Sequence, residues 1–561
     1  MHLILIVLIL VLLSPLFASA QGLSSGSQPL SETVEVSVVN VEVIVTDKDG
    51  QRVRGLQPAD FEIREDGELR SITNFSEFGS SDLSMLADES GTSVSTETGT
   101  ATEKPVGRRI VFFFDDFALK PEKSEIFFRS LKELLRRSLR AEDRAMILTY
   151  KTRLRKQIDF TNDVSRLESE LDKVARETPP PITLDRETRE FEETSEFFVQ
   201  AEQFAGGGGG AAGGSAADHI ATSARQLAKQ AFDATRRRIE SLSAFITTLE
   251  GGEGRKVLIV ASDRLSEYAG LQFFLPRTEQ VVGPPPPDAS GFNTKRLLDK
   301  LISKANESNV TLYTLHPSGL AERATAEDLA SVNPARDYAL LQNESAALTD
   351  LSAGTGGLTA LGADSVRELL PAISEDLESY YFLGYRAEPG QKKTARKIAI
   401  KLHNSTYKAR FRHSFVNRSF DDEINDRTVA NLFDPIAASK IMIRVTARRD
   451  PKKKSGKFEI PISVQIPIDG LSPLPDGKHL KGSFTVYLAT LDLRGGFSSP
   501  SRQTQKFSIP QGQIEAARKS HFTFDTKLRV GDVPEYISVV VVDDVSREAG
   551  YVRIPFLNAP R

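Results

Sequence analysis

Short, largely apolar segments alternate with amphipathic segments through the middle of this chain, and no other feature constrains the fold as strongly. Residues 110–114 (IVFFF), 256–261 (KVLIVA) and 310–315 (VTLYTL) have the length and the β-branched or aromatic content of buried strands. Residues 122–140 and 297–306 carry apolar side chains at helical spacing. Strands buried on both faces that alternate with helices form a parallel sheet covered by helices on both sides. The sequence therefore predicts a doubly wound, mostly parallel α/β fold.

The same patterns place the rest of this α/β domain, which we expect at residues 107–415. A helix is predicted to begin near Val164, because residues 161–163 form the polar cap that precedes many helices. An insertion at 178–217 begins with prolines, continues as an acidic segment and ends in glycines, so we do not expect it to pack. Further strands are predicted at 143–150, 154–160 and 380–385, and further helices at 216–250, 344–353 and 364–378.

A small β module is expected before the α/β domain. Residues 33–46 (TVEVSVVNVEVIVT) alternate in the manner of one or two strands, and short strands follow at 61–63 and 72–78. Together they predict a β module at 33–78. Residues 79–106 are dominated by Ser, Thr, Gly and Glu, so they are expected to be a flexible linker without a core.

Helical spacing stops at Lys397, and strand-like runs separated by turn residues follow it. Runs such as 458–468, 482–492 and 536–542 recur with turn signals between them, which is the pattern of an antiparallel sandwich. We therefore expect a C-terminal antiparallel β-sandwich at 430–561.

The first residues have the pattern of a signal peptide at 1–20. Residues 3–13 form an uninterrupted apolar run, and the small residues of Ala18–Ala20 follow it as at a signal-peptidase site. The run is shorter than the roughly 20 residues that a membrane-spanning helix needs, which favours cleavage over an uncleaved anchor. We expect an exported protein, periplasmic or secreted, that starts at Gln21 and has no transmembrane segment after cleavage.

Composition excludes several classes of function. The 561 residues include 72 Lys and Arg against 76 Asp and Glu, a net charge of −4, so no large basic field attracts nucleic acid. The absence of cysteine excludes disulfides, thiolate zinc sites and cysteine nucleophiles. With seven histidines, a histidine-rich metal or catalytic site is not expected either. The basic triplet Arg236–Arg238 is expected to lie on a solvated helix face.

Three passages of the sequence carry a resemblance to a known family. They are VNVEVIVTDKDGQRVRGLQPADFEIREDGELRSITNF at 39–75, RRIVFFFDDFALK at 108–120, and RKVLIVASDRLSEY at 255–268 with NVTLYTLHP at 309–317 and LSAGTGGLT at 351–359. Together they resemble the von Willebrand factor A fold and, more narrowly, the von Willebrand factor A-related proteins of acidobacteria. The resemblance implies a domain whose ligands bind at the carboxyl ends of its strands.

Metal-binding members of that family hold Mg²⁺ with an Asp-x-Ser-x-Ser motif after the first strand, a Thr and a second Asp. By position the resemblance assigns Asp115 to the first Asp and Asp263 to the second. The two serine positions are Phe117 and Leu119, which have no side-chain oxygen. Since Mg²⁺ prefers about six oxygen ligands, the resemblance implies a degenerate adhesion site.

Other side chains could replace the missing serine oxygens, namely Asp116, Thr161, or Ser215 and Thr222. One hypothesis is a modified divalent-metal site formed by Asp115, Asp116 and Asp263, with Thr161 as a further ligand and Mg²⁺ bound weakly. The other is that these carboxylates only solvate strand ends or cap helices. No cofactor is assigned on this basis.

The catalytic motifs that we considered are absent. An Asp-x-Asp phosphatase needs a second Asp where Phe117 stands. The glycines at 206–214 lack the Gly-Lys-Ser/Thr of a phosphate-binding loop, and no HExxH zinc motif occurs. No histidine is expected beside the acidic cluster to act as a general base. The chain is therefore interpreted as a non-enzyme.

The expected function is that of an exported binding or adhesion-type protein whose α/β domain recognises a protein partner. Phe117 and Leu119 either provide exposed apolar contact area for that partner or pack into the domain. The alternatives are a metal-dependent hydrolase that uses the acidic cluster and a purely structural scaffold of the cell envelope.

Overall fold

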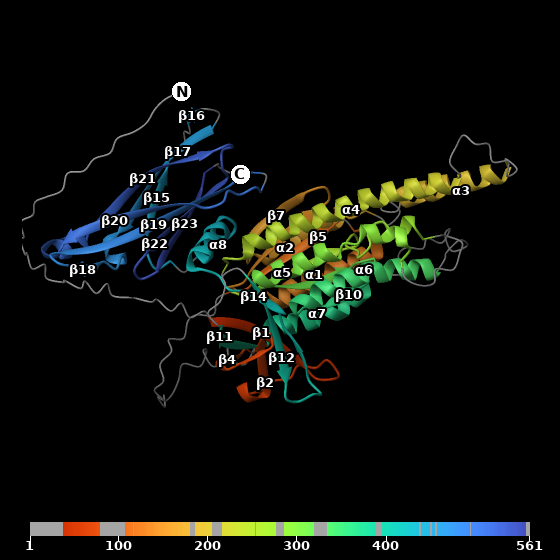
Figure 1. The fold of residues 1–561 in the computed structure, drawn as a ribbon, viewed down its shortest axis with the longest axis horizontal. Coiled ribbons are helices and arrows are strands. Elements are labelled where there is room, and N and C mark those ends of the chain that lie inside the picture. The colour runs from red at the N-terminus through yellow and green to blue at the C-terminus, as the bar shows by residue number, and fades with distance from the viewer. Residues whose placement is uncertain are drawn as a thin grey trace, which may run out of the picture. The chain divides into compact units, whose positions relative to one another are not determined.

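The computed structural model describes most of the chain from Val38 onward. The described residues are 38–78, 107–115, 117–179, 186–204, 216–252, 254–275, 285–318, 334–387, 394–436, 439–448, 452–454, 457–493 and 495–556. The expected signal peptide at 1–20, the linker at 79–106 and Asp116 lie outside them. Figure 1 labels most of the elements named below. Among the described helices, none is both long and apolar enough to cross a membrane.

The α/β domain contains a six-stranded sheet in the order β10-β9-β8-β5-β6-β7. All neighbouring pairs are parallel except β6 and β7, which are antiparallel. This is the mostly parallel, doubly wound sheet that the apolar runs predict. Its strands are β5 (Arg109–Asp115), β6 (Arg144–Tyr150), β7 (Leu154–Thr161), β8 (Lys256–Ser262), β9 (Val310–His316) and β10 (Thr359–Leu361).

Helices cover both faces of this sheet. On one face the core contains α1 (Pro121–Ser138), α2 (Val164–Glu177) and α7 (Ala363–Glu378). On the other face it contains α4 (Ala216–Leu249), α5 (Lys295–Glu307) and α6 (Pro334–Thr355). Successive residues of β5 alternate between the two cores: Phe112 lies in the first, and Val111 and Phe113 lie in the second. A strand buried in this way has no polar face, which is why its sequence is continuously apolar.

The insertion at 178–217 differs from the expectation that it would not pack. Residues 186–204 form helix α3 (Arg186–Phe204), beside α4 (Figure 1). The ring of Phe191 packs edge-on against Phe273, with centroids 5.4 Å apart. Glu192 forms an ion pair with Arg336 at 2.7 Å. These few contacts anchor a segment whose overall composition is acidic and polar. Residues 180–185 and 205–215 lie outside the described residues.

The N-terminal strands do not form a module by themselves. The strands β1 (Val38–Thr46) and β4 (Ile72–Phe78) both pair with β11 (Tyr380–Arg386), which lies between them. In a second sheet, β2 (Phe61–Glu65) pairs with β12 (Ala395–Leu402) and β3 (Glu68–Arg70). The short strands β13 (Lys408–Arg410) and β14 (Ser414–Val416) extend the two sheets beside β1 and β12.

The β module therefore consists of residues 38–78 together with 380–416, and its core draws on both segments. We expected residues 380–415 to belong to the α/β domain, and this boundary is wrong. Instead, the α/β domain is inserted between β4 and β11. Periodicity indicates that a segment is a strand, but it does not indicate which distant strand will be its neighbour.

Helix α8 (Phe420–Phe433) was not expected, because we predicted no helix after Lys397. Ser419 caps it by accepting a hydrogen bond from the backbone N–H of Asp422 at 3.2 Å. Polar as well as apolar side chains of α8 are buried, so its sequence lacks a clear apolar stripe: the side chain of Asn431, for example, donates to the hydroxyl of Ser538 at 2.9 Å.

After α8 the chain forms two antiparallel sheets whose inner faces share one core. The first contains β15 (Arg444–Ala447), β16 (Lys452–Lys454), β17 (Lys457–Pro467) and β21 (His521–Val530). The second contains β18 (Leu474–Asp476), β19 (His479–Leu491), β20 (Ser501–Pro510), β22 (Tyr536–Asp543) and β23 (Ala549–Pro555). The short helix α9 (Ile514–Ala517) follows β20.

Candidate functional site

Asp115 is the last residue of β5, and its side chain is fully buried. Strands β5 and β8 are in register, so Ser262 lies opposite Asp115 at the same edge of the sheet. The hydroxyl of Ser262 donates to Oδ2 of Asp115 at 2.6 Å. The guanidinium of Arg238, from α4, forms an ion pair with Oδ1. Both carboxylate oxygens are therefore engaged by donors of the chain itself.

Arg238 is 6% exposed, and its guanidinium also lies over the ring of Tyr150, 5.3 Å from the centroid. The expectation that the triplet Arg236–Arg238 occupies a solvated helix face is therefore wrong for this residue. Successive helical residues are about 100° apart, and on α4 Arg236 and Arg237 are exposed whereas Arg238 is turned toward the sheet. Arg238 supplies the positive charge that Asp115 needs once it is removed from water.

Asp263 directly follows β8 and is 7% exposed. Its carboxylate accepts a hydrogen bond from the hydroxyl of Ser318, and the Ser318 backbone N–H lies 3.3 Å from Oδ1. The Nδ1 atom of His316 lies 3.3 Å from the same oxygen. On the other side of the imidazole, Nε2 lies 2.8 Å from Oε2 of Glu344, on α6. The fully buried His316 thus links two carboxylates.

The expectation that no histidine lies beside the acidic cluster is wrong. His316 is the last residue of β9, and β9 is the neighbour of β8. Carboxyl ends of adjacent parallel strands meet at one sheet edge, so His316 and Asp263 are brought together by the fold. The sequence carried this signal in the passage VTLYTLHP, where the histidine immediately follows a buried strand.

The structure does not bring Thr161 to this edge. Strand β7 runs antiparallel to β6, and Thr161 pairs with Ala145 near the beginning of β6. Thr161 therefore lies at the opposite edge of the sheet, where its hydroxyl accepts from the backbone N–H of Asp163 at 3.1 Å. Of the other alternative ligands, Thr222 is exposed on α4, and Asp116 and Ser215 lie outside the described residues.

Phe117 and Leu119 are both buried, at 4% and 3% exposure. The ring of Phe117 packs against Phe114 and edge-on against Phe127, with centroids 6.2 and 5.5 Å away. Of the two interpretations of these residues, packing into the domain is the one that the structure supports. They offer a partner no contact area, and their sequence positions lack oxygen because they belong to the core.

These donors do not fit a divalent cation. A hard cation at Asp115 would have to displace the Arg238 guanidinium from a buried carboxylate, and Phe117 and Leu119 provide no further oxygen. Within the described ranges, no group of three or more His, Asp or Glu side chains is arranged to hold a metal ion. The site is a closed network of ion pairs and hydrogen bonds.

Comparison with known proteins gives distant structural neighbours. No protein-family model and no curated protein matches the chain. Among solved structures, proximal thread matrix protein 1 from the mussel byssus, with a zinc-occupied MIDAS motif, is 11% identical over 51% of this chain and 49% of its own, with a TM-score of 0.25. BatB from Bacteroides thetaiotaomicron is 12% identical over 48% of this chain and 97% of its own, with a TM-score of 0.23.

The pilus adhesin SpaC from Lactobacillus rhamnosus GG is 10% identical over 91% of this chain and 62% of its own, with a TM-score of 0.25. This chain spans about half the length of the mussel byssus protein, 47% in a second crystal form. The α/β domain has the mostly parallel sheet with helices on both faces that the resemblance to the von Willebrand factor A fold implies.

Proposed function

We propose that this exported chain is a binding protein and that its α/β domain recognises a protein partner without a divalent cation. The observation that carries the proposal is the engagement of Asp115 by Arg238 and Ser262. A metal-dependent adhesion site needs a cation with an open position for the partner's acidic group. Here a guanidinium neutralises the carboxylate instead, and the charges balance inside the domain. Recognition must then use another surface of the domain.

The second candidate is a hydrolase, because Ser318, Asp263 and His316 form one cluster at the strand ends. A serine nucleophile needs a hydrogen bond to a general base. In this cluster the Ser318 hydroxyl donates to Asp263, while the two imidazole nitrogens of His316 face Asp263 and Glu344. His316 is also fully buried, so a substrate does not reach it. This arrangement favours a structural network over catalysis.

Affinity capture tests the proposal. The mature chain, residues 21–561, is immobilised and exposed to a cell-envelope extract in Mg²⁺ and, separately, in EDTA. We expect the same partner at the same yield in both buffers. A partner that is lost in EDTA would contradict a metal-independent domain. If no partner is captured in either buffer, the structural-scaffold alternative is favoured.

The variant Ser318→Ala separates binding from hydrolysis. A binding domain should retain its partner, because the Ser318 hydroxyl donates within the domain, to the buried carboxylate of Asp263 and to the carbonyl of Ala118. A hydrolase that uses this hydroxyl should lose its turnover of the captured partner. Measuring both yield and cleavage of the partner for this variant decides between the two candidates.

A further inference from the structure

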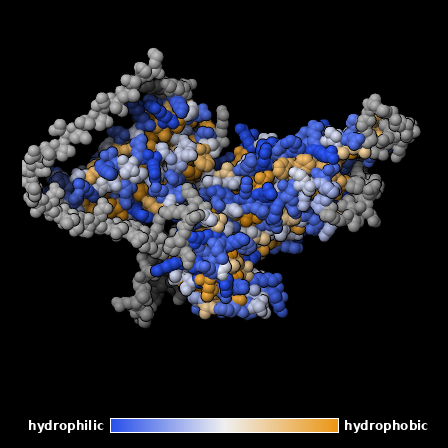
Figure 2. Space-filling model, in the orientation of Figure 1, coloured by the Kyte–Doolittle hydropathy of each residue, from blue (hydrophilic) through white to orange (hydrophobic). Residues whose placement is uncertain are grey.

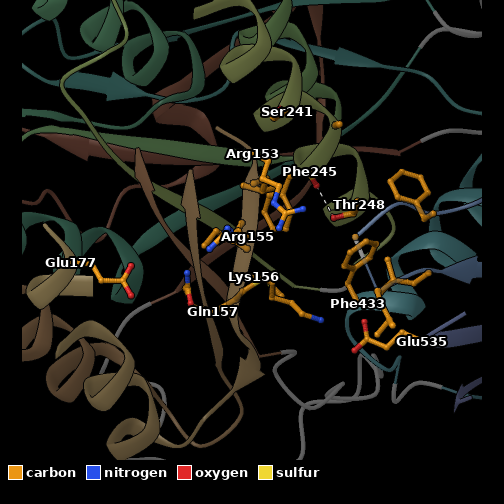
Figure 3. Close-up of a pocket in the computed structure, with 18 residues that line it drawn as sticks. Arg153, Arg155, Lys156, Gln157, Glu177, Ser241, Phe245, Thr248, Phe433 and Glu535 are labelled. Atoms are coloured by element: carbon orange, nitrogen blue, oxygen red, sulfur yellow. Dashed lines mark hydrogen bonds between the residues drawn. The ribbon is translucent and has the colours of Figure 1, made fainter. Parts of the chain in front are cut away.

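A cavity of about 740 Å³ lies between the edge of the α/β sheet and the C-terminal part of the chain (Figure 3). From the α/β domain, its lining includes residues 153–157 at β7 and Phe245 of α4. From the C-terminal part it includes Phe433, at the end of α8, and Phe497, between β19 and β20. Neither part alone forms the cavity.

Helix α8 connects the two walls of the cavity, because it is bonded both to the α/β domain and to the C-terminal sandwich. Asp434, which follows α8, forms ion pairs with Arg109 of β5 and with Arg144 of β6, the latter at 2.8 Å. On its other side, α8 accepts hydrogen bonds at the carbonyls of Leu432 and Phe433 from Arg553 of β23, at 3.1 and 2.9 Å. The cavity is thus built by paired charges and not by loose contact.

The cavity runs along the free edge of β7. Neighbouring residues of a strand point to opposite faces, yet the lining includes the consecutive residues 153–157. It also includes Glu177 from α2, on one face of the sheet, and Phe245 from α4, on the other. Only the strand edge adjoins both faces. β7 is the last strand of its sheet, and among the described residues its outer side pairs with no other strand.

The cavity joins an apolar part to a cationic part. Leu493 and Phe497, which also line the cavity, are 68% and 37% exposed. Arg153 and Arg155 are exposed, and neither forms an ion pair within the part of the chain that the structure describes. Lys156 is paired with Asp159 at 2.8 Å.

Two carboxylates also line the cavity. Glu177 lies 3.8 Å from Lys151, and the side chain of Glu535 is half-buried. Because neither Arg153 nor Arg155 forms an ion pair among the described residues, the strand edge carries positive charge beside these two carboxylates. Elsewhere, on the face shown in Figure 2, hydrophobic residues lie in small groups among hydrophilic ones. A cavity that offers both apolar and charged contacts suits a peptide ligand better than it suits a flat, apolar protein surface.

We propose that this cavity, called the cleft below, binds an extended, acidic segment of a partner protein. The segment adds a strand to the free edge of β7, so that main-chain hydrogen bonds supply affinity. Its carboxylates face Arg153 and Arg155, and its alternate apolar side chains enter the part lined by Phe245 and Phe497. This inference rests on the proposed function and names the surface and the partner chemistry that recognition uses.

Charged residues on an edge strand also protect it from unwanted pairing. That role accounts for Arg155 and Lys156, but it does not account for the exposed Leu493 and Phe497 or for a cavity of this volume beside them. Acidic and apolar groups in one ligand satisfy both parts of the cleft. Arginine is also among the residues that most often dominate the binding free energy of protein interfaces.

Two fluorescein-labelled peptides of about eight residues, a typical strand length, test the proposal on the mature chain. In one, glutamate alternates with leucine; in the other, lysine alternates with leucine. Fluorescence anisotropy should show that the acidic peptide binds at least about tenfold more tightly than the basic one. Its affinity should fall as salt is added. Equal affinity for the two peptides, or no binding of the acidic one, would overturn the proposal.

Variants locate the binding surface. Arg153→Glu combined with Arg155→Glu should weaken binding of the acidic peptide at least about tenfold. The matched control combines Arg129→Glu with Arg137→Glu, on α1, where both arginines are exposed. A similar loss in the control would mean that only net charge matters, and would overturn the cleft as the site.

Leu493→Ser combined with Phe497→Ser tests the apolar part. It should weaken the alternating acidic peptide several-fold, while Met442→Ser combined with Leu474→Ser, also exposed, should not. Polyglutamate of the same length should bind more weakly than the alternating peptide. Equal binding of polyglutamate would overturn the apolar contribution and leave a plain anion site.

The two proposals fail in different ways. If the wild type captures its partner without metal and the Arg153→Glu and Arg155→Glu variant captures it equally well, the domain is an interaction domain and the cleft is not its surface. If capture requires Mg²⁺, the proposed function fails whatever the peptides show. Competition of the acidic peptide with the captured partner would support both.

Discussion

The carboxylate of Asp376, near the end of α7, accepts a hydrogen bond from the guanidinium of Arg410, on β13, at 2.8 Å. Arg410 donates to Oδ1 of this carboxylate, and Arg52, which follows β1, pairs with the same atom. The hydroxyl of Tyr313, on β9, donates to Oδ2 at 2.8 Å. Asp376 is fully buried. Donors from the β module and from the α/β domain therefore converge on one carboxylate, and this carboxylate fastens the two together.

Asp376→Ala should strongly destabilise the protein. It would leave Arg52 without its carboxylate partner in a buried position, and breaking a buried ion pair in this way costs about 3–5 kcal/mol. Urea unfolding at neutral pH measures the loss. Asp364→Ala is the matched control, because Asp364 lies on the same helix but is half-exposed in its pair with Lys123. Its effect should stay below about 1 kcal/mol.

The same carboxylate should make stability depend on pH. Burial alone raises the pKa of Asp376, but Arg410 and Arg52 outweigh it and hold the pKa below its ordinary value. The folded state thus binds the proton less readily than the unfolded state. The stabilisation is complete above the unfolded pKa of about 3.9 and is lost as pH falls through the lower folded pKa.

Unfolding free energies between about pH 6 and about pH 3 measure this dependence. The wild type should lose more stability over this range than Asp376→Asn, which carries no titrating group at this position. Parallel curves for the two proteins would show that other carboxylates account for the acid sensitivity.

Lys256 should make the opposite kind of contribution. Burial, helped by the charge of Arg412, lowers the pKa of Lys256 to about 8. Below that pH the folded state holds a charged ammonium away from water, with the carbonyl of Glu250 as a hydrogen-bond acceptor at 3.0 Å. Stability should therefore rise between about pH 8 and about pH 10, as the folded state releases this proton before the unfolded state does.

Lys256→Met removes the titrating group and keeps the length of the side chain. We expect the variant to be more stable than the wild type at neutral pH, by about 1–3 kcal/mol, and to lack the rise at alkaline pH. Chemical unfolding across this pH range is the measurement. A less stable variant would show that the ammonium is well satisfied by its neighbours.

Phe117→Ser should not create a metal site. It places an oxygen where metal-binding von Willebrand factor A domains, which the sequence resembles, have serine, but Phe117 is part of an aromatic core and Arg238 still engages Asp115. We expect a loss of about 3–5 kcal/mol of stability, as for other large core aromatic residues. Calorimetry should detect no binding of Mg²⁺, Mn²⁺ or Ca²⁺ to this variant or to the wild type. A measurable exothermic titration of either protein would contradict the closed network.

Export should remove the first twenty residues. The small residues Ala18–Ala20 after an apolar run predict cleavage before Gln21. Mass spectrometry of the protein recovered from the periplasm or the medium should find Gln21 as its terminus. An intact Met1 in a membrane pellet would point to an uncleaved anchor.

The central sheet could be predicted because its burial on both faces leaves a direct trace in the sequence. Continuous apolar runs such as 110–114, short and rich in β-branched or aromatic residues, are typical of strands buried on both faces, and β5 and β8 lie at the expected places. The cap of α2 was equally local: Asp163 accepts from the backbone N–H of Arg166 at 3.1 Å. Because carboxyl ends of adjacent parallel strands lie at one edge of a sheet, the sequence also predicted that Asp115 and Asp263 lie at the same edge.

The wrong predictions concern features that depend on contacts between segments far apart in the sequence. Whether β11 joins the central sheet or pairs with β1 depends on residues more than three hundred positions away. Arg238 is one of three successive arginines, and only the register of α4 on the sheet selects it for burial beside Asp115. Helix α8 contacts other elements on several sides, so its apolar residues form no single stripe. No pattern of one segment contains this information.

The insertion of the α/β domain into the β module has a consequence for how such chains can diversify. Phe78 of β4 and Tyr380 of β11 are direct partners in the sheet, and their rings stack with centroids 5.0 Å apart. The chain therefore leaves the β module after Phe78 and returns to it at Tyr380, so the two ends of the inserted segment lie side by side at one insertion point. Another domain whose two ends lie equally close together could replace the α/β domain at this insertion point without altering the strand order of the β module. An exchanged domain would also have to replace the buried carboxylate of Asp376, which pairs with Arg52 and Arg410 of the module.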